Sequence, residues 1–166
     1  MFRKILVPID GSPTSNRGLD EAIELAKDQS ATLCLLHVVD DLVVTQGLSA
    51  TMYASAAYVD EFIDALREGG KKILAKAEAK VRNKDIACES VLLETLGRSV
   101  ADVIIEQTRK RRADLIVLGT HGRRGLTRMV MGSDAEAVVR STQVPVLLVR
   151  AAETPRSGRP KRGRKR

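Results

Sequence analysis

Asp114-Leu115-Ile116-Val117-Leu118 is an apolar run typical of a buried strand, and Gly119-Thr120-His121-Gly122 follows it directly. Gly132-Ser133 comes nine residues later. A helical pattern begins there, with one apolar face formed by Ala135, Val138 and Val139. The glycines therefore lie in a loop between the end of a strand and the start of a helix. In open α/β sheets, ligands bind outside the carboxyl ends of the strands, where such loops lie.

The glycine loop has two interpretations on its spacing alone. Glycines let the backbone approach a ligand closely, and the following helix offers N–H groups and a positive dipole end that suit phosphate. Alternatively, the loop is a connection that ends in a helix cap. Ser133-Asp134-Ala135-Glu136 fits a capping box with Ser133 as the N-cap residue. Spacing alone leaves both interpretations open.

Four further segments have the apolar composition of buried strands. They are residues 3–9, 31–39, 87–93 and 144–149. Together with residues 114–118 they give strands that alternate with helical patterns, which predicts right-handed βαβ units and a parallel sheet. The strands are apolar on both faces, so we expect helices to cover both sides of the sheet. The predicted fold class is therefore α/β.

The helical patterns between the strands have recognisable starts. Ser12 followed by Pro13 fits an N-cap with proline at the first helical position, and Ser99 fits another N-cap. Residues 55–82 predict a long helical segment that Gly69-Gly70 interrupts, so we expect a kink or two consecutive helices there. Residues 40–54 have no clear period and predict a loop.

Three motifs, taken in chain order, resemble the universal stress protein family. Gly119, Gly122 and Gly132-Ser133 match its nucleotide-binding signature of Gly, two residues, Gly, nine residues and then Gly-Ser or Gly-Thr. Lys4–Ser12 looks like the family's first strand and Asp-Gly-Ser turn, and Val144–Val149 looks like its last strand. The resemblance covers roughly residues 2–150, and we place a single domain at residues 1–150.

The resemblance to this family implies both a topology and a place for the ligand. The fold would be an open, Rossmann-like sheet of five parallel strands in the order 3-2-1-4-5, with helices on both faces. A ligand crevice would lie between strands 1 and 4, where the strand order reverses. The glycine loop after residues 114–118 would form one wall of that crevice.

The resemblance also implies an adenine-nucleotide site, whose base and ribose contacts come from the first two strands. Pro8 and Ile9 would line the base pocket, and Val39, placed to within one residue of Val38, would contact adenine through its backbone. Asp10 would accept hydrogen bonds from the ribose hydroxyls. The alternative for Asp10 is a turn-forming role, because Asp-Gly is a common turn pair.

The glycine signature would supply the phosphate contacts. Gly119 and Gly122 would bring the backbone close to ribose and phosphate, whereas Gly132 and Ser133 would present N–H groups and a hydroxyl to the β- and γ-phosphates. The nucleotide-binding set is completed by Thr120, His121, Arg123 and Asp134. The arginine could pair with phosphate or be a solvated loop charge, and the histidine is assigned no catalytic role.

Asp134 departs from the family pattern, in which an apolar residue more usually follows Gly-Ser. An acid in the first helical turn stabilises the helix, but it repels phosphate if its side chain points into the site. We therefore expect a nucleotide affinity that is weaker than the glycine pattern suggests, or that depends on metal. No metal site is expected from protein side chains alone, and Mg²⁺ bound through the phosphates is compatible with this site.

The function implied by the resemblance is that of an ATP-binding regulatory or stress-response protein with slow or no hydrolysis. The residues do not separate ATP from AMP or another adenine nucleotide. The alternative is a family member that binds no nucleotide and acts through protein–protein contacts. An enzyme is disfavoured because the chain has no Walker A lysine motif and His121 has no partner histidine. A homodimer paired through Val144–Val149 would cover an apolar edge strand.

The net charge of +7 belongs almost entirely to residues 151–166, which hold seven basic residues and one acidic residue. We expect this Pro- and Gly-containing segment to be a disordered tail able to bind polyanions.

No apolar run reaches transmembrane length and no secretory signal pattern is present, so we expect a cytoplasmic protein. Cys34 and Cys88 match no zinc spacing, and a disulfide between them is not expected.

Overall fold

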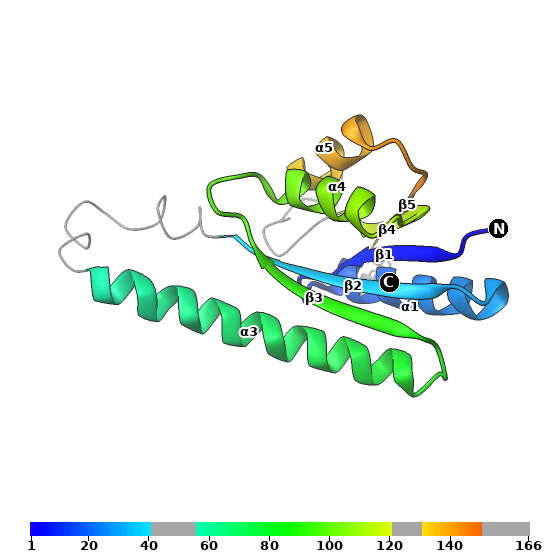
Figure 1. Cartoon of the computed structure of the whole chain (residues 1–166), viewed down its shortest axis with the longest axis horizontal. Helices are drawn as coiled ribbons and strands as arrows, with labels where there is room; N and C mark the ends of the chain where they lie inside the picture. Colours follow the sequence, from blue (N-terminus) through cyan, green and yellow to red (C-terminus); the bar gives the residue numbers. More distant parts are fainter. Residues whose placement is uncertain (41–55, 121–130, 151–166) are drawn as a thin grey trace, which may run out of the picture.

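The computed structural model describes residues 1–40, 56–120 and 131–150 (Figure 1). It contains a sheet of five strands, all parallel. They are β1 (Lys4–Pro8), β2 (Thr32–Val39), β3 (Cys88–Glu94), β4 (Leu115–Gly119) and β5 (Val146–Val149). The order across the sheet is β3-β2-β1-β4-β5, which confirms the predicted topology. The order reverses between β1 and β4, which is where a doubly wound sheet opens a ligand crevice.

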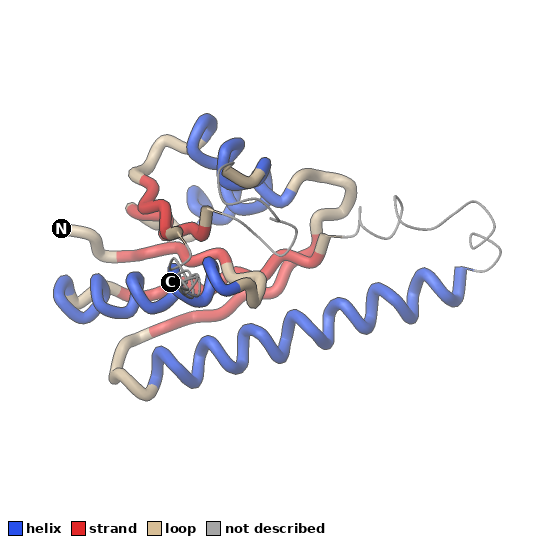
Figure 2. The backbone as a smooth tube through the Cα atoms, turned by 180° about the vertical axis from the view of Figure 1, so that it is seen from behind, coloured by secondary structure: helices blue, strands red, loops and turns tan. Residues whose placement is uncertain are grey.

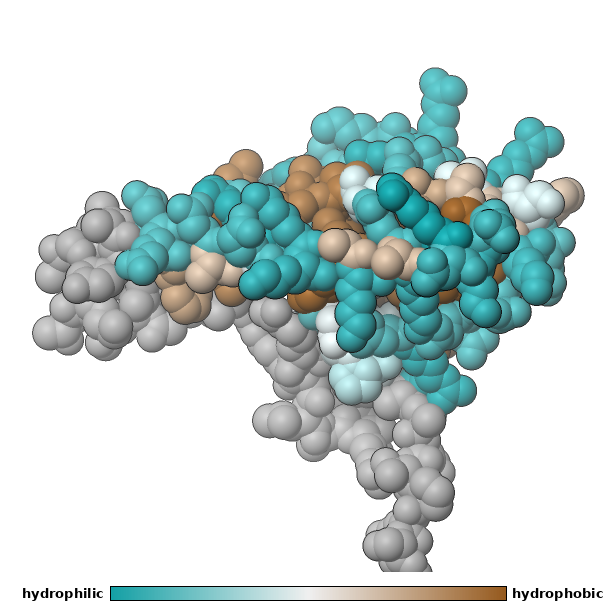
Figure 3. All heavy atoms as spheres, turned by 90° about the horizontal axis from the view of Figure 1, so that it is seen from below, coloured by the Kyte–Doolittle hydropathy of each residue, from teal (hydrophilic) through white to brown (hydrophobic). Residues whose placement is uncertain are grey.

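Helices cover both faces of the sheet, as predicted. Those described are α1 (Pro13–Gln29), α3 (Ala56–Arg82), α4 (Val100–Lys110) and α5 (Ser133–Ser141). α1 and α3 pack on one face, and α4 and α5 pack on the other; Figures 1 and 2 show this arrangement from opposite sides. Seen from below, the surface is mostly hydrophilic, with smaller hydrophobic areas between the charged side chains (Figure 3).

Successive residues of the central strands enter two separate hydrophobic cores. Ile5 and Val7 of β1 pack with α1 and α3, whereas Leu6 between them packs with α4 and α5. In β2, Leu35 and Leu36 divide in the same way. All of these side chains are almost fully buried. Burial of such a side chain contributes about 1.5–3 kcal/mol, which explains why the strands are continuous apolar runs.

The two cysteines lie on opposite faces of the sheet. Cys34 belongs to the core under α4 and α5, whereas Cys88 packs against the core under α1 and α3. Side chains on opposite faces cannot meet, so no disulfide joins them, and both thiols are free. Burial raises the pKa of the Cys34 thiol to about 11, so the thiolate is scarce at neutral pH.

α3 is one continuous helix, and Figures 1 and 2 show no kink in it, so the predicted kink or division at Gly69-Gly70 is wrong. A side chain at Gly69 would meet no atom within 4 Å, whereas Gly70 lies tightly against His37 and Leu92. Packing of the apolar face of α3 on the sheet outweighs the low helix propensity of the two glycines. Gly70 is therefore explained by close packing and not by a bend.

α1 and α4 begin as predicted, each with a serine side chain as its cap. Ser12 Oγ accepts a hydrogen bond from Ser15 N at 3.1 Å, and Pro13 is the first helical residue. Ser99 Oγ accepts a hydrogen bond from Asp102 N at 3.1 Å. Both side chains satisfy an N–H group that the first helical turn would otherwise leave without a partner.

α5 begins one residue earlier than the predicted capping box requires, so that prediction is wrong. Gly132 is the N-cap residue and makes no side-chain cap hydrogen bond. Ser133 is already the first helical residue, and its side chain is too far along the chain to act as the cap. The carboxylate of Glu136 pairs with Arg140 on the next turn instead of reaching back.

Some predictions fall outside the described residues. They concern residues 41–54 of the predicted loop, the site residues His121, Gly122 and Arg123, and the basic segment 151–166. In the part of the chain that the structure describes, no helix has the length and apolar character needed to cross a membrane. The cytoplasmic location stays a prediction.

Candidate functional site

A cavity of about 410 Å³ lies at the carboxyl ends of β1, β2 and β4, against the N-terminus of α5. This is the edge of the sheet where the strand order reverses. The predicted site residues that line the cavity are Pro8, Ile9, Asp10, Val39, Gly119, Thr120, Gly132, Ser133 and Asp134. The structure therefore brings together all of the predicted site residues that it describes.

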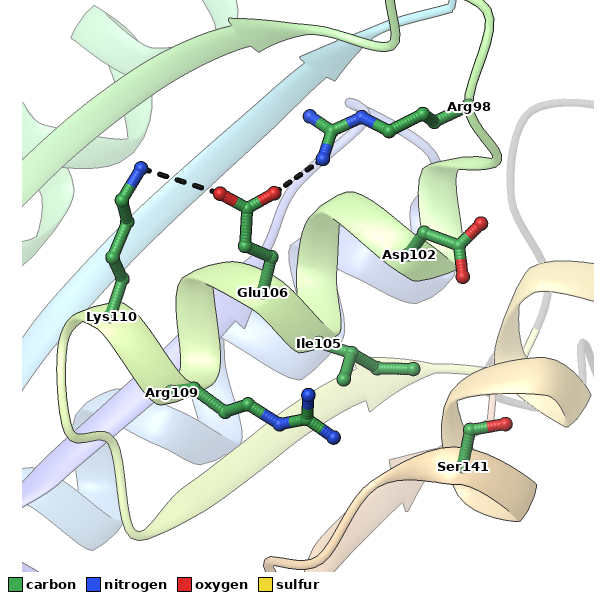
Figure 4. A pocket seen from close by; sticks show the side chains of 7 residues that line it. All are labelled: Arg98, Asp102, Ile105, Glu106, Arg109, Lys110 and Ser141. Atoms are coloured by element: carbon green, nitrogen blue, oxygen red, sulfur yellow. Dashed lines mark hydrogen bonds and ion pairs between the residues drawn. The ribbon is translucent and has the colours of Figure 1, made fainter.

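A second hollow, of about 600 Å³, lies on the outer side of α4, next to the end of α5 (Figure 4). Its charged side chains largely pair with one another, because Glu106 forms ion pairs with Arg98 and, at 3.3 Å, with Lys110. Figure 4 shows Arg109 extending across the hollow toward Ser141. Since none of the predicted site residues lines this hollow, whereas all those that the structure describes line the first cavity, we assign the ligand site to the first cavity.

The turn between β1 and α1 fixes Asp10 at the cavity. Asp10 Oδ1 accepts a hydrogen bond from Ser12 N at 2.9 Å, and Asp10 N donates one to Ser15 Oγ at 3.4 Å. Gly11 has a φ of +81°, a left-handed conformation that glycine adopts without strain. Asp10 thus forms the turn and also lines the cavity, so its two predicted roles are compatible.

The N-terminus of α5 opens into the same cavity, which Ser133, Asp134 and Ala135 line. Gly132 provides no side chain as a cap, and the N–H groups of a first helical turn have no acceptor within the helix itself. Gly132 N donates to Thr120 O at 2.9 Å, which holds the helix start beside the end of β4. Such an arrangement suits an anion, through both the N–H groups and the helix dipole.

The alternation of hydrogen bonds in β2 decides which residue turns its backbone toward the cavity. Val39 O accepts from Thr95 N at 3.0 Å on the β3 side, whereas Leu36 O accepts from Ile9 N at 2.8 Å on the β1 side. Successive residues of a parallel strand direct their N–H and C=O groups to opposite neighbours. Val38 therefore directs both groups toward the β1 side, beyond the end of β1. Both valines line the cavity.

The part of the cavity lining that the structure describes is acidic. Asp40 lines it beside the predicted residues Asp10 and Asp134, so three carboxylates border the space. Among residues 1–40, 56–120 and 131–150, no group of three or more His, Cys, Asp or Glu side chains is arranged to hold a metal ion.

Several residues that line the cavity were not predicted from the sequence. They are Ser15, Leu36, His37, Asp40, Leu66, Val100, Ile104, Leu118 and Ala135. Leu66 comes from α3, and Val100 and Ile104 come from α4, so only the packing of distant helices brings them to the site. For Asp40 a signal was available, because an acid directly after a buried strand resembles the placement of Asp10.

Fold and site together define a doubly wound, Rossmann-like α/β domain with its ligand cavity at the switch point. The sequence pattern of the universal stress protein family matches residues 1–150, and the chain belongs to this family. Universal stress protein YxiE of Bacillus subtilis is 36% identical over 151 residues, which span 90% of this chain and 100% of that protein. A family protein from Burkholderia pseudomallei, of known structure, is 33% identical and has a TM-score of 0.69 over 90% of this chain and 96% of that one.

Three solved structures of lower identity share the fold and contain adenine nucleotides. A family protein from Arabidopsis thaliana with AMP bound has a TM-score of 0.65 at 20% identity, over 91% of this chain and 93% of that one. A universal stress protein from Archaeoglobus fulgidus in complex with dAMP has a TM-score of 0.60 at 23% identity, over 89% and 97%. A universal stress protein in complex with cAMP has a TM-score of 0.61 at 22% identity, over 91% and 98%.

Proposed function

We propose that this protein binds an adenine nucleotide in the cavity and acts as a regulatory stress-response protein, with slow or no hydrolysis. One observation carries the proposal: the N-terminus of α5, whose N-cap residue is Gly132, opens into the cavity that Asp10 also lines. A helix start of this kind binds phosphate through its N–H groups and dipole. Family membership, and the AMP, dAMP and cAMP of three structural neighbours, support adenine as the base.

The base would lie against Pro8 and Ile9, with its polar edge on the backbone of β2. Adenine presents an amino donor beside a ring-nitrogen acceptor. The C=O and N–H groups of a single residue match this pair, and we favour Val38 over Val39 because its backbone groups face the cavity side. Asp10 would accept hydrogen bonds from the ribose hydroxyls.

The phosphates would lie at the start of α5, on the N–H groups of Gly132 and Ser133 and on the serine hydroxyl. His121, Gly122 and Arg123 belong to the proposed phosphate contacts, although they lie outside the described residues. We expect ATP to bind together with Mg²⁺ held through its phosphates, because the cation offsets the negative charge of the triphosphate. AMP carries fewer charges and should depend less on the cation.

The first test identifies the ligand. Full-length protein is purified and denatured, and any released nucleotide is identified by mass spectrometry; titration calorimetry then measures AMP and ATP, each with and without Mg²⁺. We expect heat from both nucleotides. If millimolar concentrations of either nucleotide give no heat under any of these conditions, the proposal fails.

A pair of substitutions tests the role of the α5 N-terminus. Ser133→Ala removes the hydroxyl only, whereas Ser133→Pro also removes the N–H group and is tolerated at the first helical position. We expect Ser133→Pro to weaken ATP binding about tenfold and Ser133→Ala to weaken it less, because hydrogen bonds to a charged group are the stronger ones. Equal ATP affinities of the two variants would show that the Ser133 N–H group does not contact the nucleotide.

The alternative function is that of a family member that binds no nucleotide and acts through protein–protein contacts. Failure of the calorimetric test would favour this alternative.

We also propose that residues 151–166 add salt-sensitive binding to polyanions, because they carry most of the net positive charge. A chain ending at Arg150 should lose that binding and keep its nucleotide affinity. Loss of nucleotide binding on truncation would contradict this division of roles.

A further inference from the structure

His37 is a buried histidine whose ring holds the start of the Asp10 turn. It is 5% exposed, and its Nδ1 lies 2.6 Å from the carbonyl oxygen of Ile9. A carbonyl oxygen can only accept, so Nδ1 carries a proton and donates it. His37 is thus a core histidine with a hydrogen-bond partner, and that partner belongs to the residue directly before Asp10.

The Ile9 carbonyl and the Asp10 N–H group belong to one planar peptide unit. His37 Nδ1 holds the carbonyl end of this unit, and Ser15 Oγ accepts from the N–H end at 3.4 Å. Ile9 N is held as well, since it donates to Leu36 O at 2.8 Å. Because the plane of this peptide sets the direction in which the Asp10 side chain leaves the backbone, His37 helps to set the place of the carboxylate.

One face of α3 holds both the His37 ring and the turn beside it. A Cβ built on Gly70 would lie 2.5 Å from His37 Cδ2 and 3.0 Å from Nε2, so the helix backbone lies directly on the ring. Ile73, almost one turn later, has its Cδ1 3.2 Å from the position of a Cβ on Gly11. Leu66, about one turn earlier, lines the cavity. These residues share a face of the helix because they recur at three- and four-residue spacing.

We propose that His37 is a positioning residue for the ligand site: held in place by Gly70, it fixes the Ile9–Asp10 peptide so that the Asp10 carboxylate faces the ribose. The inference rests on the proposed ribose role of Asp10. It also accounts for a glycine in the interior of α3, because any side chain at residue 70 would displace the ring.

The test compares two substitutions of His37 in the full-length protein, with AMP as the probe in titration calorimetry. His37→Asn keeps a donor nitrogen at the same number of bonds from Cα as Nδ1, whereas His37→Leu has no donor. We expect His37→Leu to weaken AMP binding about tenfold, on the scale of one buried hydrogen bond, and His37→Asn to recover most of the loss. Combined with Asp10→Asn, His37→Leu should add little, because the two residues act through one contact.

Val81→Ala is the matched control for lost stability. Val81 is fully buried on the same helix but lies about 16 Å along the helix axis from Gly70. This variant should lower the melting temperature and leave AMP affinity within about twofold, since distant sites act independently. In the ligand-free protein, the Asp10 amide resonance should move in His37→Leu and stay near its wild-type position in His37→Asn.

Three results would overturn the role of His37: wild-type affinity in His37→Leu, an equal loss in His37→Asn and His37→Leu, or full additivity with Asp10→Asn. Failure of the proposed function has a different signature. In that case the wild-type protein binds neither AMP nor ATP, while the Asp10 amide resonance of the ligand-free protein still reports whether His37 holds the turn.

Discussion

Gly119 at the end of β4 lies against Thr14 in the first turn of α1, with no room for a side chain between them. A Cβ built on Gly119 would lie 2.9 Å from the carbonyl carbon of Thr14 and 3.0 Å from its Oγ1. The approach of α1 to β4 therefore requires the glycine, whether or not a ligand is bound. Because Gly119 also lines the cavity, the packing of α1 and the shape of the site depend on one residue.

We expect Gly119→Ala to lower the free energy of unfolding by about 1–3 kcal/mol, the usual cost of adding a methyl group to a tightly packed place. Chemical denaturation measures the difference. Gly69→Ala is the control, because its Cβ would meet no atom within 4 Å. Alanine is the better helix former, so this variant should gain about 0.5–1 kcal/mol. A Gly119→Ala variant as stable as the wild type would contradict the close approach of α1.

Leu96 adopts a backbone conformation that suits asparagine or glycine better than leucine. Leu96 has a φ of +50° and Gly97 one of +78°, and Arg98 N donates to Thr95 O at 3.1 Å, which closes a turn with two left-handed central residues. The Leu96 side chain is 73% exposed, so little burial offsets the strain. Leucine at this position of the turn is therefore expected to lower the stability of the protein.

We expect Leu96→Asn to raise the free energy of unfolding by about 0.5–1 kcal/mol, because asparagine tolerates the left-handed region. Thermal denaturation, monitored by circular dichroism, measures this change in the free energy of unfolding. Gly97→Ala should have the opposite effect and lose about 1 kcal/mol, since it places a Cβ at positive φ. If Leu96→Asn is destabilising, the leucine makes a contact that outweighs its strain.

Glu89 on β3 lies between two cations, Lys4 Nζ at 2.8 Å and Arg111 Nη1 at 2.9 Å. The ion pair with Lys4, together with that with Arg111 and against partial burial, lowers the pKa of the Glu89 carboxyl below its ordinary value of 4.5. Since the folded pKa lies below the unfolded one, the carboxylate stabilises the fold above about pH 4.5. This contribution is lost as the pH falls through the folded pKa.

We expect Glu89→Gln to lower the free energy of unfolding by up to about 1 kcal/mol at neutral pH, because solvent screens a side chain that is more than a third exposed. The difference in unfolding free energy from the wild type should shrink as the pH falls below 4.5. Denaturation curves recorded at several pH values measure this difference. Glu21→Gln is the control: its carboxylate lies 3.9 Å from Arg17 and is half exposed, so it should matter little at any pH. A pH-independent loss in Glu89→Gln would mean that packing, not charge, explains it.

The strands were predictable from the sequence, whereas the contacts between distant elements were not. β1 was predicted at residues 3–9 and forms at Lys4–Pro8, because a strand buried on both faces leaves a continuous apolar run. The site residues followed from the family motifs at the strand ends. Gly70 was misinterpreted because its reason is the ring of His37, on a strand more than thirty residues earlier.

Two further features, the start of α5 and the direction of the backbone groups of β2, also depend on contacts between elements that are distant in the sequence. Ser133 fits a capping box by sequence, yet Gly132, which donates a hydrogen bond to Thr120 O, is the N-cap residue and the helix starts one residue earlier. The choice between Val38 and Val39 depends on the register of β2 against its neighbours, and a one-residue shift exchanges the two sides. Local patterns carry no information on either relationship.

The predicted homodimer depends on β5, which pairs only with β4 in the described sheet and so forms one of its edges. Leu147 in this strand is 39% exposed. An edge strand with exposed apolar side chains offers unpaired backbone groups to another chain, and pairing with a second copy would satisfy and cover them. We therefore propose that the dimer interface includes Leu147.

We expect the wild-type protein to show twice its chain mass of 18.1 kDa by light scattering at micromolar concentrations. Leu147→Lys should shift the mass toward one chain, because it adds a positive charge to each of the two edge strands that pair. Phe62→Lys is the matched control: Phe62 on α3 is 47% exposed, so the same change of an exposed apolar residue is made away from β5. A wild-type mass of one chain would refute the dimer. An equal shift in both variants would refute β5 as its interface, because the effect would then follow from added charge alone.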